Sequence, residues 1–426
     1  MPDLFARWLS LLTFLCVYVL FVVRPRQRTW VALAGAFVVV GTGSVSPQTA
    51  FWSINWNVMG IFWGMLVISE LFMRSGVPAF LAERMVQSSS SSRTAIIYLF
   101  CLSSGISIFL ENVAVVLLLA PVAFQIVKRL DISPVPVLIG IAVCSNLQGT
   151  ATLIGDPPSM LLGSYAKMDF LDFFVLHGKP SIFFAVELGA VAGMVVLFIV
   201  LGRGRPLSEQ RVPYHISSLF PAYLLIGLIV VLAASSFIDL EFEGIPGLVC
   251  IVSAVLGFCW HAASTDEGTW KMFKGLDWDT TAFLLCVFVL VGSLSANGWL
   301  DSLARGLVSV VGTRVLVCYV VLVVLSVMIS AFVDNVPFLV AMLPVTKQLA
   351  ASANIDPTVL YFGLLLGASV GGNITPIGAS ANIVAVGQLR QQGYPMTFWR
   401  FVKIGLPFTV VAVSVAAVFA WIVFGP

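Results

Sequence analysis

Long apolar runs alternate with short polar stretches along almost the whole chain. At about 1.5 Å per residue, an apolar helix of roughly 20 residues crosses the ~30 Å hydrocarbon core of a bilayer. The pattern therefore predicts a polytopic, all-α membrane protein. The candidate spans lie at about 4–23, 30–45, 54–73, 135–165, 181–201, 217–237, 245–261, 280–297, 358–390 and 404–425.

Two further apolar regions, about 94–129 and 314–350, are each interrupted by a polar pair, Glu111-Asn112 or Asp334-Asn335. Each arm has about 17 residues and reaches about 25 Å, which is shorter than the hydrocarbon core of about 30 Å. Both regions are therefore expected to be re-entrant hairpins that enter and leave on one side. Twelve full crossings are the competing interpretation.

The spans at 135–165 and 358–390 are interrupted by residues that break helices. The first contains Gly149, Gly155, Pro157 and Pro158, and the second has a matching stretch from Ser369 to Asn382. Glycine is a poor helix former and proline removes a backbone donor. Non-helical backbone at membrane depth is tolerated only where protein or a polar cavity surrounds it. We expect two broken helices that line a site.

The two broken spans are copies of one pattern. Thr152 pairs with Thr375 at an offset of 223 positions, and Glu111 pairs with Asp334 at the same offset. Paired broken segments in corresponding halves indicate a transporter binding site. We expect a first repeat at 1–201, a linker at 202–216 and a second repeat at 217–426. With five spans and one hairpin each, the two repeats would be inverted.

Composition and charge agree with this topology. The chain is 59% hydrophobic and 10% charged, whereas a soluble domain has about 25% charged residues. With the N-terminus outside and the linker in the cytoplasm, most of the 22 Lys and Arg residues, including Arg28, fall on the cytoplasmic side, as the positive-inside rule requires. We expect both termini outside the plasma (inner) membrane. The six basic residues on the outer side are Arg7, Lys167, Lys179, Arg305, Arg314 and Lys347.

Five acidic residues fall at membrane depth, where a charge costs about 2.5–3.5 kcal/mol at a helix centre. They are Glu70, Glu111, Asp156, Glu187 and Asp334. We assign Glu111, Asp156 and Asp334 to proton coupling, with simple N-capping of helices as the alternative. Glu70 is expected to pair with Arg74 four residues later, and Glu187 has no assigned role.

Neutral polar side chains gather on the broken spans and beside the two acidic tips. They suit a small hydroxylated solute or a dehydrated cation. No basic residue is expected among them, and Glu111, Asp156 and Asp334 would repel an anion. The residues assigned to solute binding are Asn112, Asn146, Thr150, Thr152, Asn335, Asn373, Thr375, Ser380 and Asn382.

The sequence contains no motif typical of a disulfide framework or a zinc site. The seven cysteines show no CxxC spacing, and HExxH does not occur. We therefore expect no catalytic residues, no metal centre and no cofactor.

The motifs FLENV (109–113) and NLQGTATLIGDPPS (146–159), with FVDNV (332–336) and GGNITPIGASAN (371–382), resemble the ion transporter superfamily. The closer branch contains arsenite permeases, NhaD-type sodium–proton antiporters and the melanosomal P protein. The resemblance implies inverted repeats, a scaffold and a moving transport part with elevator-type access, a homodimer as in related dicarboxylate carriers, and a soluble ATPase partner. Those carriers have Ser-Asn-Thr at both hairpin tips, and this departure argues against a dicarboxylate or tricarboxylate substrate.

The first functional hypothesis is export of arsenite or antimonite coupled to proton influx. The alternative is a sodium–proton antiporter on the same fold, with Asp156 and Asp334 as cation ligands. A carboxylate or anion symporter and a channel fit less well. The expected partners are a small inorganic solute, protons and the lipid bilayer, with no nucleic acid.

Overall fold

The computed structural model describes residues 4–24, 27–130, 132–202, 204, 216–238, 244–265, 268–312 and 314–426. The described chain is mostly helical, so the expectation of a helical membrane protein is confirmed. Its one small sheet is an antiparallel pair of two-residue strands, β1 (Val175–Leu176) and β2 (Lys179–Pro180). Most of the expected linker at 202–216 lies outside the described residues.

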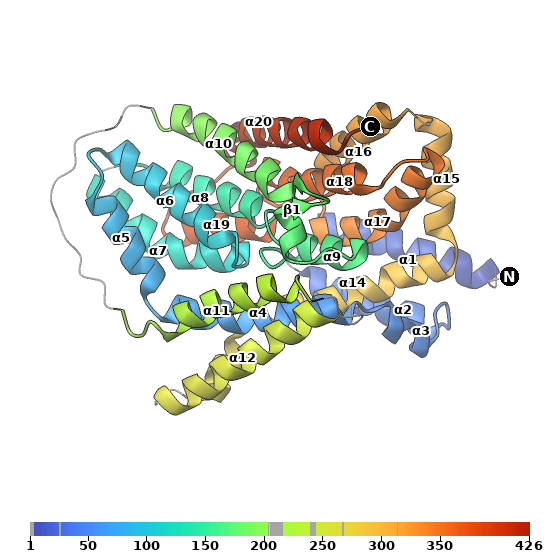
Figure 1. Cartoon of the computed structure of the whole chain (residues 1–426), viewed down its shortest axis with the longest axis horizontal. Helices are drawn as coiled ribbons and strands as arrows, with labels where there is room; N and C mark the ends of the chain where they lie inside the picture. The colour runs from blue at the N-terminus through green and yellow to red at the C-terminus, as the bar shows by residue number, and fades with distance from the viewer. Residues whose placement is uncertain are drawn as a thin grey trace.

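The helices form two layers along the long axis of the molecule, one in the lower and one in the upper half of Figure 1. The lower layer holds α1 (Leu4–Val23), α2 (Arg28–Gly41), α3 (Pro47–Ser53), α4 (Trp56–Arg74), α11 (Phe220–Ser235), α12 (Ile245–Ser264), α13 (Thr269–Gly275) and α14 (Trp278–Ala296). The upper layer holds α6 (Ser92–Ser107), α7 (Asn112–Leu130), α8 (Pro134–Gln148), α9 (Pro157–Ala166), α10 (Ile182–Val200), α16 (Val315–Ser330), α17 (Asn335–Ser352), α18 (Thr358–Gly371), α19 (Ser380–Gln391) and α20 (Phe398–Phe424).

Two shorter helices connect the layers at opposite ends of the molecule (Figure 1). α5 (Val77–Gln87) follows α4 at one end, and α15 (Trp299–Val311) follows α14 at the other. Both chain termini lie toward the α15 end. The chain forms seven α-helices from α4 to α10 and seven from α14 to α20, and in each series the second helix is the short one that connects the layers.

Within the lower layer, each half of the chain packs on the other half. α4 packs against α12, and α14 packs against α2. Gly60 and Gly64 allow the close approach on α4, because a Cβ at Gly64 would lie 2.5 Å from the backbone of Cys250 on α12.

The starts of α4 and α14 are built alike. The side chain of Asn55 accepts a hydrogen bond from the Val58 amide (3.1 Å), and Asp277 accepts one from the Thr280 amide (2.9 Å). Each cap satisfies one of the amides left free in a first helical turn. Two residues after the first cap, Asn57 accepts a hydrogen bond from the Gly247 amide at the start of α12 (2.8 Å).

Seven helices of the described chain are long and apolar enough to cross a membrane, by length and composition. The chain is therefore an integral membrane protein. α7 is among the seven, so its length alone also permits a full crossing, as in the interpretation with twelve spans. The seven are α1, α4, α7, α10, α12, α14 and α20.

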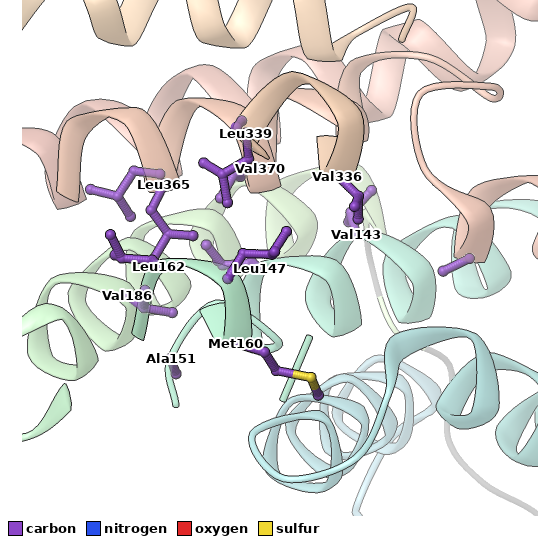
Figure 2. Close-up of a cluster of buried hydrophobic side chains, with 14 of the residues drawn as sticks. Val143, Leu147, Ala151, Met160, Leu162, Val186, Val336, Leu339, Leu365 and Val370 are labelled. Carbon is purple, nitrogen blue, oxygen red and sulfur yellow. The ribbon is translucent and has the colours of Figure 1, made fainter. Parts of the chain in front are cut away.

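In the upper layer, both expected hairpins are helix pairs, α6–α7 and α16–α17, with short tips at 108–111 and 331–334. Both interrupted spans consist of two helices, α8 with α9 and α18 with α19. A short 3-10 turn, η3 (Gly372–Ile374), begins the second break. Apolar side chains of α8, α9, α17 and α18, including Leu147, Leu162, Leu339 and Leu365, face one another beside these breaks (Figure 2). They hold the non-helical backbone inside protein rather than in lipid.

The glycines of the two breaks are required by close backbone packing. A Cβ at Gly155 would lie 2.6 Å from the carbonyl oxygen of Gly149, and one at Gly378 would lie 2.6 Å from that of Gly372. Each carbonyl is fixed in its own loop, so any larger side chain would force the loop to open. The repeated glycines therefore shape two equivalent tight loops.

Candidate functional site: a cavity between the hairpin tips and the broken helices

The two hairpin tips and both helix breaks meet at one small buried cavity of about 30 Å³. This is room for about two water molecules. The cavity lining includes six of the residues assigned from the sequence, together with Arg28, Thr280, Phe283 and Leu284. The six are Glu111, Asn112, Asp156, Asp334, Asn335 and Ser380.

Five helices begin at this cavity. The first residues of α2, α7, α9, α17 and α19 all belong to its lining: Arg28, Asn112, Pro157, Asn335 and Ser380. A helix N-terminus carries free N–H groups and about half a positive charge. These converging N-termini explain how a membrane protein can hold several carboxylates at this depth.

The two tip carboxylates do cap helices. Glu111 accepts a hydrogen bond from the Ala114 amide (3.1 Å), and Asp334 accepts one from the Val336 amide (3.2 Å). Asp156 differs, because within the described residues its side chain accepts no cap bond from the first turn of α9. Its recorded contact is with Asn112 Nδ2 at 3.4 Å, and only 4% of the residue is exposed. Capping therefore accounts for part of the role of the tips, and it does not explain Asp156.

Four asparagines, one of which is Asn112 of the cavity lining, join the two halves of the chain. Asn146 Nδ2 donates to Asn373 Oδ1 (2.7 Å) and to Asn382 Oδ1 (2.9 Å). Asn146 Oδ1 accepts from Asn112 Nδ2 (2.8 Å), which links the network to the first hairpin tip. All four are buried, so their amides need hydrogen-bond partners within the protein. Asn373 and Asn382 also donate to backbone carbonyls, those of Val143 and Gly372.

The threonines of the breaks bind the hairpins rather than line the cavity. Thr152 donates its hydroxyl hydrogen to the carbonyl of Ile108, and Thr375 donates to the carbonyl of Ala331. These carbonyls lie at the ends of α6 and α16, where helix carbonyls lack helical partners. Thr150 donates to the carbonyl of Asn146 (3.4 Å). The cavity lining contains none of these three threonines.

Arg28 corrects the sequence interpretation, which expected no basic residue among the site residues. Its guanidinium forms an ion pair with the Asp334 carboxylate and donates to Ser380 Oγ at 2.7 Å. It also lies over the Phe283 ring, with 4.8 Å from Cζ to the ring centroid. The sequence signal was obscured because Arg28 belongs to a cluster of arginines that reads as a surface loop.

The two remaining membrane-depth acids lie away from the cavity. Glu70 pairs with Arg74 on α4 (2.6 Å), which confirms the expected i,i+4 pair. Glu187 on α10 interacts with Gln148 of α8. Neither acid belongs to the cavity lining.

The cavity chemistry suits a proton or a small polar solute. Three carboxylates face one guanidinium, and asparagine, threonine and serine side chains supply neutral donors and acceptors. Within the described ranges, no group of three or more His, Cys, Asp and Glu side chains is arranged to hold a metal ion. Broken helices and helix tips around a buried polar cavity, in a chain this apolar, define a membrane transporter rather than an enzyme.

Comparison with known proteins identifies the family. The model of the citrate transporter family (CitMHS) matches residues 18–267 and 246–425, and the chain belongs to this family within the ion transporter superfamily. The uncharacterized transporter Rv2685 of Mycobacterium tuberculosis is 30% identical over 430 residues, covering 97% of this chain and 98% of that protein. The P protein of Sus scrofa is 27% identical over 486 residues, covering 94% of this chain and 57% of that protein.

Two solved structures share the fold. The YdaH transporter of Alcanivorax borkumensis superposes with a TM-score of 0.59 at 14% identity, covering 99% of this chain and 98% of that one. MtrF of Neisseria gonorrhoeae, described as one of a class of antimetabolite efflux pumps, gives a TM-score of 0.55 at 13% identity, covering 86% of this chain and 81% of that one. At these identities the likeness concerns the fold alone.

Proposed function

We propose that the protein is a secondary active transporter that exports a small inorganic solute, arsenite or antimonite, in exchange for protons. The observation that carries this proposal is the cavity, where Glu111 and Asp334 of two equivalent hairpin tips meet Asp156 of the first helix break. Ionisable groups buried at membrane depth mark ion pathways and proton relays. Asp156 is the first choice for the coupling proton, because capping does not account for it.

We further propose that residues 1–201 and 217–426 are inverted repeats. The positions of α5 and α15 at opposite ends of the molecule support this proposal, as does the repeated order of elements (Figure 1). In an inverted pair the two hairpins enter from opposite sides of the membrane and meet at the cavity. The upper layer would be the moving transport part of an elevator, and the lower layer its scaffold.

The neutral polar side chains of the cavity lining support a small solute that carries hydroxyl groups. Arsenous acid is small, neutral at physiological pH and rich in hydroxyl groups, so Asn112, Asn335 and Ser380 are suitable partners. Citrate carries several negative charges, and the three carboxylates of the cavity lining would repel it. The tip carboxylates also occupy the helix N-termini of α7 and α17, where an anionic substrate would otherwise bind.

The second candidate function is sodium–proton antiport by the same fold. The excess of carboxylates over guanidinium in the cavity favours a cation. Arsenite–proton exchange is the first choice, because Asn112, Asn335 and Ser380 offer neutral donors and acceptors to a hydroxylated solute beside the carboxylates. The proposal also includes both termini outside the plasma (inner) membrane, a homodimer and a soluble ATPase partner.

A transport assay in inverted vesicles separates the two candidates. With an imposed pH gradient, we expect uptake of arsenite into the vesicles, and arsenite should dissipate the gradient. Sodium chloride at matched osmolarity should leave the gradient unchanged. Dissipation by sodium together with no arsenite uptake would overturn the first candidate in favour of the second.

A further inference from the structure

Arg28 connects the two layers of the molecule. It is the first residue of α2, in the lower layer, whereas its partners Asp334 and Ser380 begin α17 and α19 in the upper layer (Figure 1). It is also the one basic side chain that lines the cavity in the described part of the chain. One partly buried ion pair therefore joins the layers at the cavity.

Without Asp334, the position of the Arg28 side chain would be energetically unfavourable. A cation at the first residue of a helix is disfavoured by the positive end of the helix dipole. The side chain is also only 17% exposed, and a buried guanidinium without a counter-ion carries a large desolvation cost. The Phe283 ring adds only a weaker attraction. Arg28 should therefore stay with Asp334 for as long as that carboxylate is ionised and unoccupied.

The charges around this pair belong to four other elements. Asp156, in the first break, and Tyr18, on α1, interact electrostatically with Asp334. Glu111, at the first hairpin tip, interacts with Arg28 and with Asp277 at the start of α14. Protonation of Asp334 neutralises the one carboxylate that forms an ion pair with the Arg28 guanidinium in the described residues.

We propose that Arg28 is a tethered counter-ion that competes with the transported cation for Asp334 and holds the two layers together while Asp334 is empty. This inference rests on the proposed function. A proton, or a sodium ion, that binds Asp334 displaces Arg28 and frees α17 and α19 to move relative to α2. The empty carrier stays locked, so transport is an exchange rather than a leak.

Among the described residues, this ion pair holds only the second hairpin tip. Glu111 is the repeat equivalent of Asp334. In the order of helices, α12 corresponds to α2, because each is followed by one short helix and then by α14 or α4. The first turn of α12 runs Ile245-Pro-Gly-Leu248 and contains no basic residue. The first hairpin tip therefore has no tethered cation from this helix, and one residue controls the release of the second tip alone.

Hydrogen exchange of the purified protein at pH 8 tests the lock without any transport assay. We expect Arg28→Gln and Asp334→Asn each to speed exchange roughly fivefold or more in peptides covering 332–340 and 376–384. Arg28→Lys should fall between these variants and the wild type. The double variant should exchange no faster than either single variant, because each change removes the same ion pair. The matched control, Arg74→Gln, breaks an ion pair within α4 and should leave these peptides unchanged.

Unchanged exchange in Arg28→Gln, or effects that multiply in the double variant, would overturn the lock. If Arg28→Gln does not fold, the exchange rates of Asp334→Asn and Asp334→Glu are compared instead. Only Asp334→Asn removes the negative charge, so only it should speed exchange. Proteoliposomes with no solute on either side add a second readout, in which Arg28→Gln should dissipate a pH gradient faster than wild type. A wild type without coupled proton flux would refute the proposed function and leave the hydrogen-exchange result standing.

Discussion

Asp156→Asn should reduce proton-coupled transport to the background of protein-free liposomes while leaving the protein folded. The amide has nearly the same shape as the carboxylate but cannot gain or lose a proton in this pH range. Folding should survive, because Asp156 forms no helix cap and its contact with Asn112 is long at 3.4 Å. The amide also removes the cost of an ionised group at this depth.

Proton flux followed with a pH-sensitive dye in proteoliposomes measures the effect, and the melting temperature in detergent reports the fold. Glu70→Gln is the matched control, since it neutralises a membrane-depth carboxylate that pairs with Arg74 away from the cavity. It should keep coupled transport. Full coupled transport by Asp156→Asn at several pH values would show that the carboxylate is structural.

Asn146→Leu should cost about 3–6 kcal/mol of stability. Leucine has a similar volume, but it leaves Asn373 Oδ1 and Asn382 Oδ1 without the donor they share. It also removes the acceptor of Asn112 Nδ2 at 2.8 Å. Each buried polar group left unpaired costs about 1–3 kcal/mol, and a typical domain has only about 5–15 kcal/mol of stability. The folded yield should fall sharply.

Size-exclusion profiles and melting temperatures in detergent would measure this loss. The control is Ser369→Ala, at the repeat equivalent of Asn146. Ser369 is equally buried, at 1% exposure, and its hydroxyl has no hydrogen-bond partner in the part of the chain that the structure describes. It should behave as the wild type does. An Asn146→Leu protein as stable as wild type would mean that the amide network does not hold the halves together.

Much of the upper layer could be predicted from the sequence, because its signals are local. Gly149, Gly155 and Pro157 interrupt a helix wherever they occur in an apolar span, and the offset of 223 finds the second copy. The acidic tip residues can also be recognised, because each interrupts an apolar region whose two arms are too short to cross a bilayer. These features depend only on neighbours along the chain, and the sequence is therefore enough to predict them. The observed α8, α9, α18 and α19 lie close to the expected ranges.

The geometry of the site depended on tertiary packing, and the sequence pattern does not contain it. Arg28 reads as part of a basic loop, and only the position of α2 beside α14 brings it to Asp334. Thr152 and Thr375 were assigned to solute binding from their type, yet each donates to a carbonyl at a hairpin tip. Spacing cannot show which way a hydroxyl points. The division of the polar residues into cavity lining and supporting network therefore required the three-dimensional contacts.

The central claim is that the two hairpins enter the membrane from opposite sides and meet at one ionisable cavity. Single cysteines at exposed Ser90, before α6, and exposed Ser309, near the end of α15, test it most directly in a background in which the seven native cysteines are replaced by serine. A membrane-impermeant maleimide should label the Ser309→Cys protein in intact cells and the Ser90→Cys protein only in inverted vesicles. Labelling of both from the same side would contradict the account.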